Sequence, residues 1–411
     1  MCKKTAAVFL AAFAFTISFA QTRSLDFFIS AGLQNSPLLK DYSEQVKWSA
    51  LDSSILSASR KPQVNGIGVI MAAPSYKGWG YDEAVTNGAN IQAVAAVSQN
   101  LFVKKTYAPQ YEALRIQNSS VNNSAKISAH ELQRDIAVQY LNAFSSFQQL
   151  DYNRSLLQLL KQEETVLESF VKQGLYRETD YLALDLEKQM QEVQISQLMI
   201  QYKADIGQLN LLCGITDTAY FEISNPIITS SIIPPSISPF VMQFRIDSLR
   251  ILNSRSLIDV RYRPRFGWFA DAGLLASNPA LMYRNFGFSF GFMFSVPIFD
   301  GHQRGFEYQK LGVSESIRNN YQQFFTIQQR LHINQIQMQL LENDKLIVQE
   351  KKLRVTSDAL VTANKILLDK GQASVSDFIL AIKNNIDIKN QLNQAEITKL
   401  QLRNELNYWN W

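Results

Sequence analysis

The sequence predicts a mainly α-helical fold with membrane β-strands, built by an internal duplication. Three observations predict it: a repeat at a fixed offset, segments of alternating hydrophobicity, and helical stretches far longer than a globular domain requires. The 411 residues exceed the length of one ordinary domain.

The first twenty residues have the composition of a signal peptide. Lys3 and Lys4 supply positive charge, an apolar stretch covers 6–19, and Ala20 is a small residue at the expected cleavage site. We therefore expect residues 1–20 to be removed and the remainder to be exported. Position 21 is a glutamine and not a cysteine, so no lipobox and no lipoprotein anchor are expected.

Charge and cysteine content exclude two kinds of feature. Without Lys3 and Lys4, 38 basic residues stand against 36 acidic ones, so no nucleic-acid surface is predicted. Cys213 is the single cysteine after the signal peptide, so an internal disulfide is excluded and a buried thiol is expected. No later stretch approaches the ~20 apolar residues of a membrane-spanning helix, and we expect any membrane contact to be made by β-structure.

The duplication is clearest at two glycines. Gly174 is followed six residues later by Asp180, and Gly371 is followed six residues later by Asp377. The two motifs lie 197 positions apart, and the same offset pairs residues on either side of them: Ser98 with Ser295, Phe102 with Phe299, and Leu209 with Leu406. An ungapped match over about 110 residues predicts a duplicated chain.

The repeat sets the expected domain limits. The first repeat covers 21–214 and the second covers 240–411, and between them lies a linker at 215–239 whose four prolines disfavour regular helix. Upstream of the strands the two halves match at an offset of 202. Helix-like stretches near 38–60 and 239–262 are followed by Pro62 and Pro264, which lie 202 positions apart. The first half therefore carries about five extra residues.

Two strand pairs are expected, one in each repeat. In 285–299, phenylalanine occupies every second position from Phe286 to Phe294, with small or polar residues between. Its partner is expected at 264–276, and the repeat copies near 62–73 and 89–102. A soluble sandwich strand also alternates, but five aromatic residues opposite small ones favour a lipid-facing strand. Four strands are too few to close a barrel, so several chains must share one.

Long helices follow each strand pair. Residues 104–173 contain one proline and no glycine, and 305–370 contain two glycines and no proline; each would form a helix of about 100 Å. Shorter helices are expected at 176–212 and 373–409, antiparallel to them. An ordinary antiparallel coiled coil, as in structural or adhesive envelope proteins, is the alternative, and the alternating strands argue against it.

Taken together, these features resemble the TolC family of outer-membrane factors over the whole mature chain. The family's strand-to-helix signature is matched by Pro297, Phe299 and Gly301, with Asp300 before the glycine. Its tip signature, a glycine followed six positions later by an aspartate, is matched in both repeats.

The resemblance implies a homotrimer whose twelve strands, four per chain, form one barrel in outer-membrane lipid and continue into an α-helical periplasmic tunnel. It implies the outer-membrane channel of a tripartite efflux or type I secretion system. The tips would dock a periplasmic adaptor protein that leads to an inner-membrane transporter. The resemblance implies no enzymatic activity, cofactor or metal.

The tip residues have two interpretations. Glycine at Gly174 and Gly371 permits a tight reversal, and Asp180 and Asp377 either cap the returning helices or line an acidic aperture. Asp377 is the aperture candidate, by its match to the family position. The family's Tyr and Arg lock positions are Leu368 and Ala373 in this chain, so closure must use other contacts.

Two further patterns suggest chemistry and are judged incidental. Gly287, Ser289 and Gly291 match the G-x-S-x-G elbow of serine hydrolases, but the strand alternation continues straight through them. The histidines lack metal-ligand spacing, and each is expected to be a surface helix residue: His130, His302 and His332. We therefore predict neither a catalytic nor a metal site.

Overall fold

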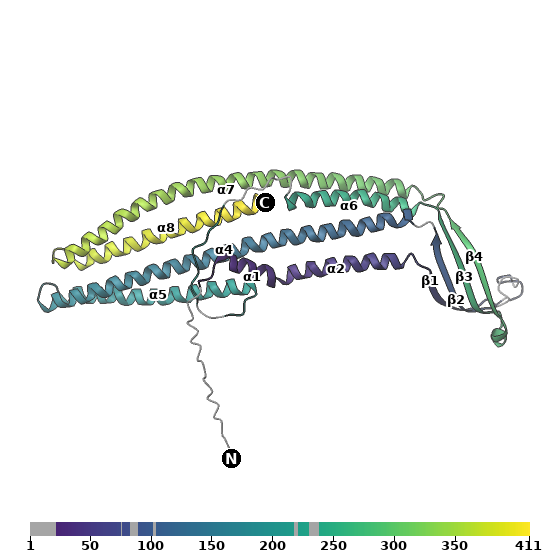
Figure 1. The fold of residues 1–411 in the computed structure, drawn as a ribbon, viewed down its shortest axis with the longest axis horizontal. Helices are drawn as coiled ribbons and strands as arrows, with labels where there is room; N and C mark the ends of the chain where they lie inside the picture. Colours follow the sequence, from purple (N-terminus) through teal and green to yellow (C-terminus); the bar gives the residue numbers. More distant parts are fainter. Residues whose placement is uncertain (1–21, 75, 83–88, 102–103, 218–220, 230–237) are drawn as a thin grey trace, which may run out of the picture. The chain divides into compact units, whose positions relative to one another are not determined.

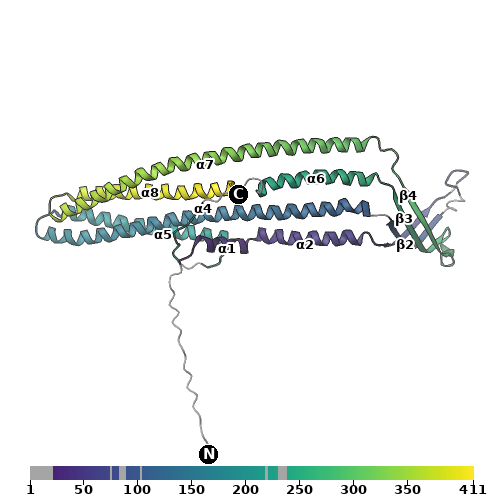
Figure 2. The same cartoon turned by 45° about the horizontal axis from the view of Figure 1, so that its top comes forward.

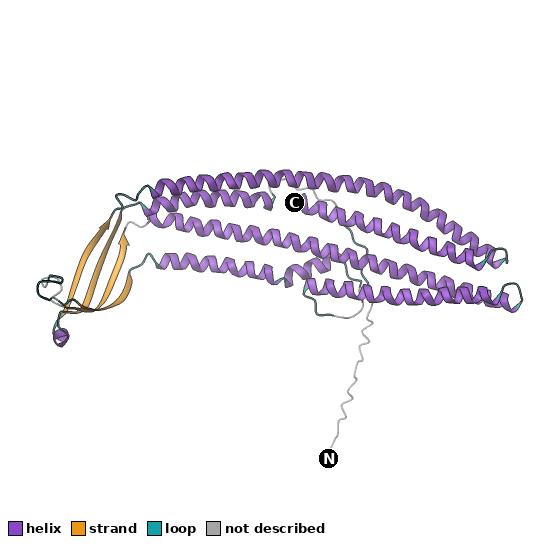
Figure 3. Ribbon diagram, turned by 180° about the vertical axis from the view of Figure 1, so that it is seen from behind, coloured by secondary structure: helices purple, strands orange, loops and turns teal. Residues whose placement is uncertain are grey.

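The computed structural model describes residues 22–74, 76–82, 89–101, 104–217, 221–229 and 238–411. Long helices and one antiparallel sheet make up these residues (Figures 1 and 3). The elements in chain order are α1 (Leu25–Asn35), α2 (Pro37–Ala58), β1 (Gln63–Ala72), β2 (Ala89–Leu101), α4 (Lys104–Lys172), α5 (Glu178–Cys213), α6 (Pro239–Arg261), β3 (Arg265–Ala276), the 3₁₀ helix η2 (Pro279–Arg284), β4 (Phe286–Ser295), α7 (Gln303–Asp369) and α8 (Val375–Trp409). The predicted combination of a mainly α-helical chain with four β-strands is confirmed. The predicted signal peptide at 1–20 lies outside the described residues.

The chain divides into two compact units. Of the described residues, the sheet unit comprises those within Pro37–Ala129, Ile233–Leu331 and Trp411, and the tip unit comprises those within Met1–Ser36, His130–Ile232 and His332–Asn410. Helices α4 and α7 contribute residues to both units. Within the described residues, no helix has the length and hydropathy needed to cross a membrane.

The sheet has the strand order β1-β2-β3-β4, and each strand is antiparallel to its neighbour (Figure 1; Figure 2 gives a second view). Its register places apolar residues of neighbouring strands opposite one another, as in the pair Trp268 and Phe292. One face, here called the aromatic face, is therefore apolar except for Gln99 of β2. Its large apolar residues are Val64, Ile70, Ile91, Val97, Leu101, Phe266, Trp268, Leu274 and the five phenylalanines from Phe286 to Phe294. All five of these β4 rings are exposed.

Strand β4 is shorter than the alternating pattern predicted. We expected a strand over 285–299, but β4 ends at Ser295. Proline lacks the N–H that a sheet ladder requires, so Pro297 cannot continue the pairing. The seven residues from 296 to 302 connect β4 to α7.

In the sheet unit, α6 is bonded to both long helices. The Asn253 side chain donates to the Pro109 carbonyl at 2.9 Å, and Asn123 on α4 donates to the Gln243 side chain at 3.1 Å. The ring of Phe325 on α7 lies 5.7 Å from that of Phe244. Helix α6 is therefore fixed between α4 and α7.

Helix α1 was not predicted from the sequence. The Ser24 hydroxyl accepts a hydrogen bond from the Phe27 N–H at 3.4 Å, as an N-cap does, and Pro37 then begins α2. Gly32 lies so close to α4 that an added Cβ would stand 2.4 Å from Ile136 Cδ1. The sequence predicted one helix near 38–60, and the structure has two in succession.

One face of α4 contributes a stripe of buried residues to the core of the tip unit. Ile136, Tyr140, Phe144 and Leu150 are buried in one cluster with residues of α1 and α5. The Tyr140 hydroxyl donates to the Ser224 carbonyl at 2.6 Å, so a strand-like segment beyond α5 is tied to the same core. The predicted burial of Cys213 is also confirmed, since its side chain is fully buried.

Element ends recur at the offsets that the sequence indicates. Helices α4 and α7 end at Lys172 and Asp369, which are equivalent positions of the repeat at the offset of 197. Helices α5 and α8 begin at equivalent positions under the same offset. Helices α2 and α6 begin at positions related by the upstream offset of 202, with a proline at the first position of each. Apart from α1 and η2, the elements of the two halves therefore correspond in order, and the paired helices differ in length by at most two residues.

Candidate functional site

The first helical tip joins α4 to α5. Gly174 has φ +75°, a left-handed conformation that favours glycine over other residues. The Leu175 N–H donates to the Phe170 carbonyl at 2.9 Å, which closes the end of α4. The Asp180 carboxylate then accepts a hydrogen bond from the Arg177 backbone N–H at 3.2 Å. Asp180 thus helps to cap the N-terminus of α5.

The second tip joins α7 to α8 with the same backbone. Gly371 has φ +68°, and the Gln372 N–H donates to the Leu367 carbonyl at 2.8 Å. Here Ser374 is the N-cap: its hydroxyl accepts from the Asp377 N–H at 3.1 Å and donates to the Asp377 carboxylate at 2.7 Å. The aspartate of each tip occupies the third position of the helix and supports its cap.

One tyrosine connects the two tips. The Tyr176 hydroxyl lies 2.9 Å from both the Leu368 and the Ala373 carbonyl oxygens, and the two oxygens share its proton. Its ring stacks on Phe170, with centroids 6.1 Å apart. Burial, together with the Asp180 and Asp369 carboxylates, raises the pKa of Tyr176. Tyr176 and Ala373 are equivalent positions of the repeat. The tyrosine of the first tip therefore bonds to the residue that occupies its equivalent position in the second tip.

This bond was not predicted from the sequence. Leu368 and Ala373 were identified only as positions where the family's lock side chains are absent, and the structure shows that their backbone carbonyls bind Tyr176 instead. The available signal was the difference between the tips, since tyrosine in the first faces alanine in the second. Sequence cannot reveal a main-chain acceptor on another helical hairpin.

Next to the tips, four helices share an apolar core that also contains polar contacts between helices. Its apolar residues come from α4, α5, α7 and α8: Leu156, Leu160, Leu167, Leu184, Leu368, Val375, Phe378 and Ile382. The buried Glu163 pairs with Lys365 at 2.6 Å, and the Tyr152 hydroxyl donates to Asn385 Oδ1 at 2.6 Å. Asn385 in turn donates to Asp358 at 2.8 Å. Moving one tip from the other would expose these groups.

The strand-to-helix connection is fixed by an aspartate. The Asp300 carboxylate accepts from the backbone N–H groups of His302 and Arg304, each at 2.9 Å, and caps α7. The hydrogen bond from Arg304 and one from the Tyr262 hydroxyl lower the pKa of Asp300. Gly301 has φ +64°. Of the predicted transition residues, Phe299 is exposed and Pro297 precedes the turn.

The hydrolase motif lies in a regular strand. Ser289 is within β4, opposite Asp271 of β3, and its hydroxyl donates to the Asp271 carboxylate at 2.6 Å. A nucleophile elbow requires a sharp turn from strand to helix, and β4 continues for six residues beyond Ser289. This geometry does not support a serine nucleophile.

The histidines differ from the prediction at two positions. His130 is half-buried, its ring stacks on Tyr408 with centroids 5.2 Å apart, and burial lowers its pKa. His302 lies in the turn before α7 and has φ +66°, while His332 is on an exposed part of α7. In the described part of the chain, no group of three His, Cys, Asp or Glu side chains is placed to hold a metal ion.

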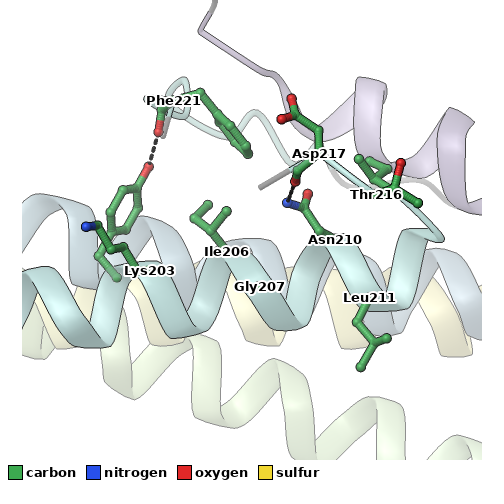
Figure 4. Close-up of a pocket in the computed structure, with 10 residues that line it drawn as sticks. Lys203, Ile206, Gly207, Asn210, Leu211, Thr216, Asp217 and Phe221 are labelled. Atoms are coloured by element: carbon green, nitrogen blue, oxygen red, sulfur yellow. Dashed lines mark hydrogen bonds between the residues drawn. The ribbon is translucent and has the colours of Figure 1, made fainter. Parts of the chain in front are cut away.

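A cavity of about 630 Å³ lies beside the last turns of α5 (Figure 4). The Tyr202 hydroxyl donates to the Phe221 carbonyl, and the Asn210 side chain donates to the Asp217 carbonyl, each at 2.8 Å. Arg23 pairs with Asp217 and lies over the Phe221 ring. These contacts hold part of the predicted 215–239 linker against α5, and none of the predicted site residues lines this cavity.

The chain resembles known proteins in structure. No protein-family model matches the chain, and no curated protein matches its sequence. The outer membrane protein VceC from Vibrio cholerae superimposes with a TM-score of 0.71 over 94% of this chain and 95% of that one, at 13% identity.

Two solved channels are similar to the same extent. The outer membrane channel CmeC of Campylobacter jejuni matches with a TM-score of 0.70 at 12% identity, over 94% of this chain and 85% of its own. The open state of the outer membrane channel MtrE of Neisseria gonorrhoeae matches with a TM-score of 0.70 at 10% identity, over 94% and 88%. The chain therefore has the fold of bacterial outer-membrane channels, which confirms, at the level of the fold, the resemblance to the TolC family.

Proposed function

We propose that the chain is a bacterial outer-membrane channel, the outer component of a tripartite efflux or type I secretion system. Its substrate passes through without chemical change, so the chain is not an enzyme. The observation that carries the proposal is the fold, which 94% of the chain shares with the CmeC and MtrE outer membrane channels.

The aromatic face of the sheet supports a membrane location. The rings of Phe286 to Phe294 are 68% to 80% exposed in the single chain, and the polar pair Asp271 and Ser289 lies on the opposite face. Lipid on one side and water on the other stabilise such a sheet. Strands of 10 to 13 residues suit a tilted bilayer crossing, which takes about 9 to 11.

The sheet also supports assembly as a homotrimer. β1 and β4 are the two edges of the four-stranded sheet, and lipid offers no hydrogen bonds to the outer groups of an edge strand. Three copies supply twelve strands and close one barrel. The outer membrane of a bacterium, with the helices in the periplasm, is the proposed location.

The helical tips are the proposed docking site for a periplasmic adaptor, which connects the channel to an inner-membrane transporter. The two turns at Gly174 and Gly371 have the same backbone, and Asp180 and Asp377 stabilise the helices that leave them. A protein that binds repeated hairpins would meet six similar tips in a trimer. Residues 1–20 are the proposed export signal.

The repeats at 21–214 and 240–411 are proposed to be two copies of one ancestral unit. Support comes from the helix ends of the tip unit, which fall at equivalent positions of the two repeats. The linker at 215–239 would then connect the copies.

Ion conductance of the purified mature chain in a planar bilayer tests the proposal. We expect discrete conductance steps that detergent-matched buffer does not give. A membrane-inserted trimer without conductance would contradict the proposal and support the alternative, a structural coiled-coil protein of the envelope.

A further inference from the structure

The cavity beside the last turns of α5 lies between one face of that helix and the segment that follows it. Its volume of about 630 Å³ is within the range of pockets that bind small organic molecules. Figure 4 shows Ile206 and Asn210 pointing from α5 toward the segment that carries Asp217 and Phe221. The described residues that line the cavity all belong to the tip unit. Its two walls therefore come from a single unit.

Hydrogen bonds hold the two walls together. The Tyr202 hydroxyl donates to the Phe221 carbonyl at 2.8 Å. The Asn210 side-chain amide donates to the Asp217 carbonyl, also at 2.8 Å. On the far side of this segment, the Arg23 guanidinium lies 4.1 Å from the centre of the Phe221 ring. The segment is thus fixed against α5, and the cavity exists before a ligand enters it.

The walls of the cavity are mainly apolar and aromatic. Ile206 and Phe221 are buried side chains of the two walls, and Ile215 lies at the turn that joins them. The ring of Tyr202 is buried on the same face of α5. Pockets with such walls bind an apolar, flat group and orient it with a few polar groups. The cavity therefore suits an aromatic ring.

Two of the described lining residues carry a charge, and one of them is already paired. Asp217 forms an ion pair with Arg23. Lys203 is exposed on α5 and belongs to none of the ion pairs among the described residues. An ammonium group without a carboxylate partner attracts an anion. The cavity thus offers one positive charge to a ligand.

Asn210 adds a hydrogen-bond acceptor. The residue is 6% exposed, and its Oδ1 is buried without a hydrogen-bond partner among the described residues. Its Nδ2 is occupied by the Asp217 carbonyl. A buried acceptor without a donor lowers the stability of the fold. A ligand that brings an N–H or O–H group to Oδ1 would remove this cost.

Gly207 leaves one side of the cavity without a side chain. It lies in the interior of the 36-residue helix α5, where glycine is less favourable than alanine. A Cβ added here would have no atom within 4 Å beyond the adjoining helix backbone and chain neighbours, so packing against the chain does not require a glycine. Lys203 and Gly207 are one helical turn apart. The missing side chain therefore keeps the approach beside the ammonium group open.

We infer that this cavity binds a small aromatic anion that carries an N–H or O–H group. The apolar walls take the ring, the Lys203 ammonium pairs with the anionic group, and Asn210 Oδ1 accepts from the donor. A compound that lacks one of the two polar groups leaves Lys203 or Asn210 without a partner and binds more weakly. The site does not require the chain to conduct ions, so its test is independent of the proposed function.

Calorimetric titration of the purified mature chain tests the site with three probes. Indole-3-acetate has a ring, an N–H and a carboxylate; indole-3-acetamide lacks the charge, and 1-methylindole-3-acetate lacks the ring N–H. We expect one indole-3-acetate per chain, with a dissociation constant on the order of 1 mM or lower for a compound of this size. Each analogue should bind roughly threefold to tenfold more weakly, because each loses one polar contact. Detergent buffer without protein gives the blank.

Substitutions assign the binding to this cavity. Lys203→Gln should remove the advantage of indole-3-acetate over indole-3-acetamide, while Lys370→Gln, at an exposed lysine of the second tip, should retain it. Gly207→Trp fills the cavity and should weaken binding of all three probes by roughly tenfold or more. Gly207→Ala is the matched control, since it adds one methyl group in open space and should bind like the unmodified chain. Circular dichroism checks that each variant is folded, and Lys203→Gln decides the matter if Gly207→Trp is not.

Three results would overturn the inference. The first is the absence of saturable binding of indole-3-acetate to the unmodified chain. The second is equal weakening by Lys203→Gln and Lys370→Gln, which would indicate a general attraction to positive charge. The third is unchanged affinity in folded Gly207→Trp, which would place the ligand elsewhere. A chain that binds the probe but does not conduct would contradict the proposed function and support the inference.

Discussion

Tyr176 joins two turns by a single hydroxyl, and the partners are main-chain carbonyls. The family resemblance placed closing residues at Leu368 and Ala373, whose side chains cannot form polar bonds. The carbonyls of these two residues accept from Tyr176, so the contact is made from the opposite tip. A side chain in one hairpin therefore holds the backbone of the other.

Replacing Tyr176 with phenylalanine should loosen the second tip. The variant keeps the ring against Phe170 and removes the shared hydrogen bond, which contributes about 1 kcal/mol. We expect roughly fivefold faster proteolysis at the exposed Lys370. The control is Tyr181→Phe, because the Tyr181 hydroxyl forms no hydrogen bond within the described part of the chain. Equal cleavage of the two variants would show that the Tyr176 bond does not hold the tip.

Cys213 should be unreactive until the tip unit unfolds. Burial raises the pKa of its thiol to about 11, so at pH 8 roughly one thiol in a thousand is ionised, compared with about one in four at an unfolded pKa of 8.5. Because the folded pKa is the higher one, this stabilising contribution is complete below about pH 8.5 and is lost as the pH rises through 11. Titration with an aromatic disulfide should be slow in buffer and fast in urea; equal rates would contradict the burial of Cys213.

Among the elements, both returning helices begin with a cap that includes an aspartate. In α5 the carboxylate binds a backbone N–H, and in α8 it binds the Ser374 hydroxyl. The structure thus supports the capping interpretation at both tips. The prediction that Asp377 also lines an acidic aperture stays a prediction, and charge can be separated from capping by substitution.

Two substitutions of Asp377 distinguish the roles. Asp377→Asn keeps an acceptor for Ser374 and removes the charge, while Asp377→Ala removes both. If the aperture is acidic, both variants should weaken divalent-cation block of the conductance, and only alanine should also lower thermal stability, by about 1 kcal/mol. Unchanged conductance and block in Asp377→Ala would exclude the aperture role.

The two faces of β4 should respond differently to charge. Phe290→Arg places a cation on the aromatic face, which costs about 2 to 4 kcal/mol near the middle of a bilayer. Met293→Arg is the control, since Met293 is also exposed but lies on the other face. We expect membrane-assembled trimer on a native gel to fall at least tenfold for Phe290→Arg only. Equal loss in both variants would argue against a lipid-facing aromatic face.

For the whole molecule, sequence patterns located most elements because their signals are local. The alternation from Phe286 to Phe294 defines a strand, and Gly174 and Gly371 define turns. Helix α1 was missed because its signals, the Ser24 cap and Pro37, are short and adjoin the predicted signal peptide. The Tyr176 bond was missed because its acceptors are backbone atoms in the other repeat, which only the tertiary structure brings close to it.

The free edges of the sheet bear on how the protein reaches its working state. A ten-residue edge strand presents about five N–H and five C=O groups outward, and each costs several kcal/mol in lipid. A lone copy therefore cannot reside in the bilayer with both edges uncovered, so insertion must accompany encounter with other copies. A copy in which one edge strand cannot pair would stop the ring from closing. Small amounts of such a copy should therefore reduce the assembly of intact copies.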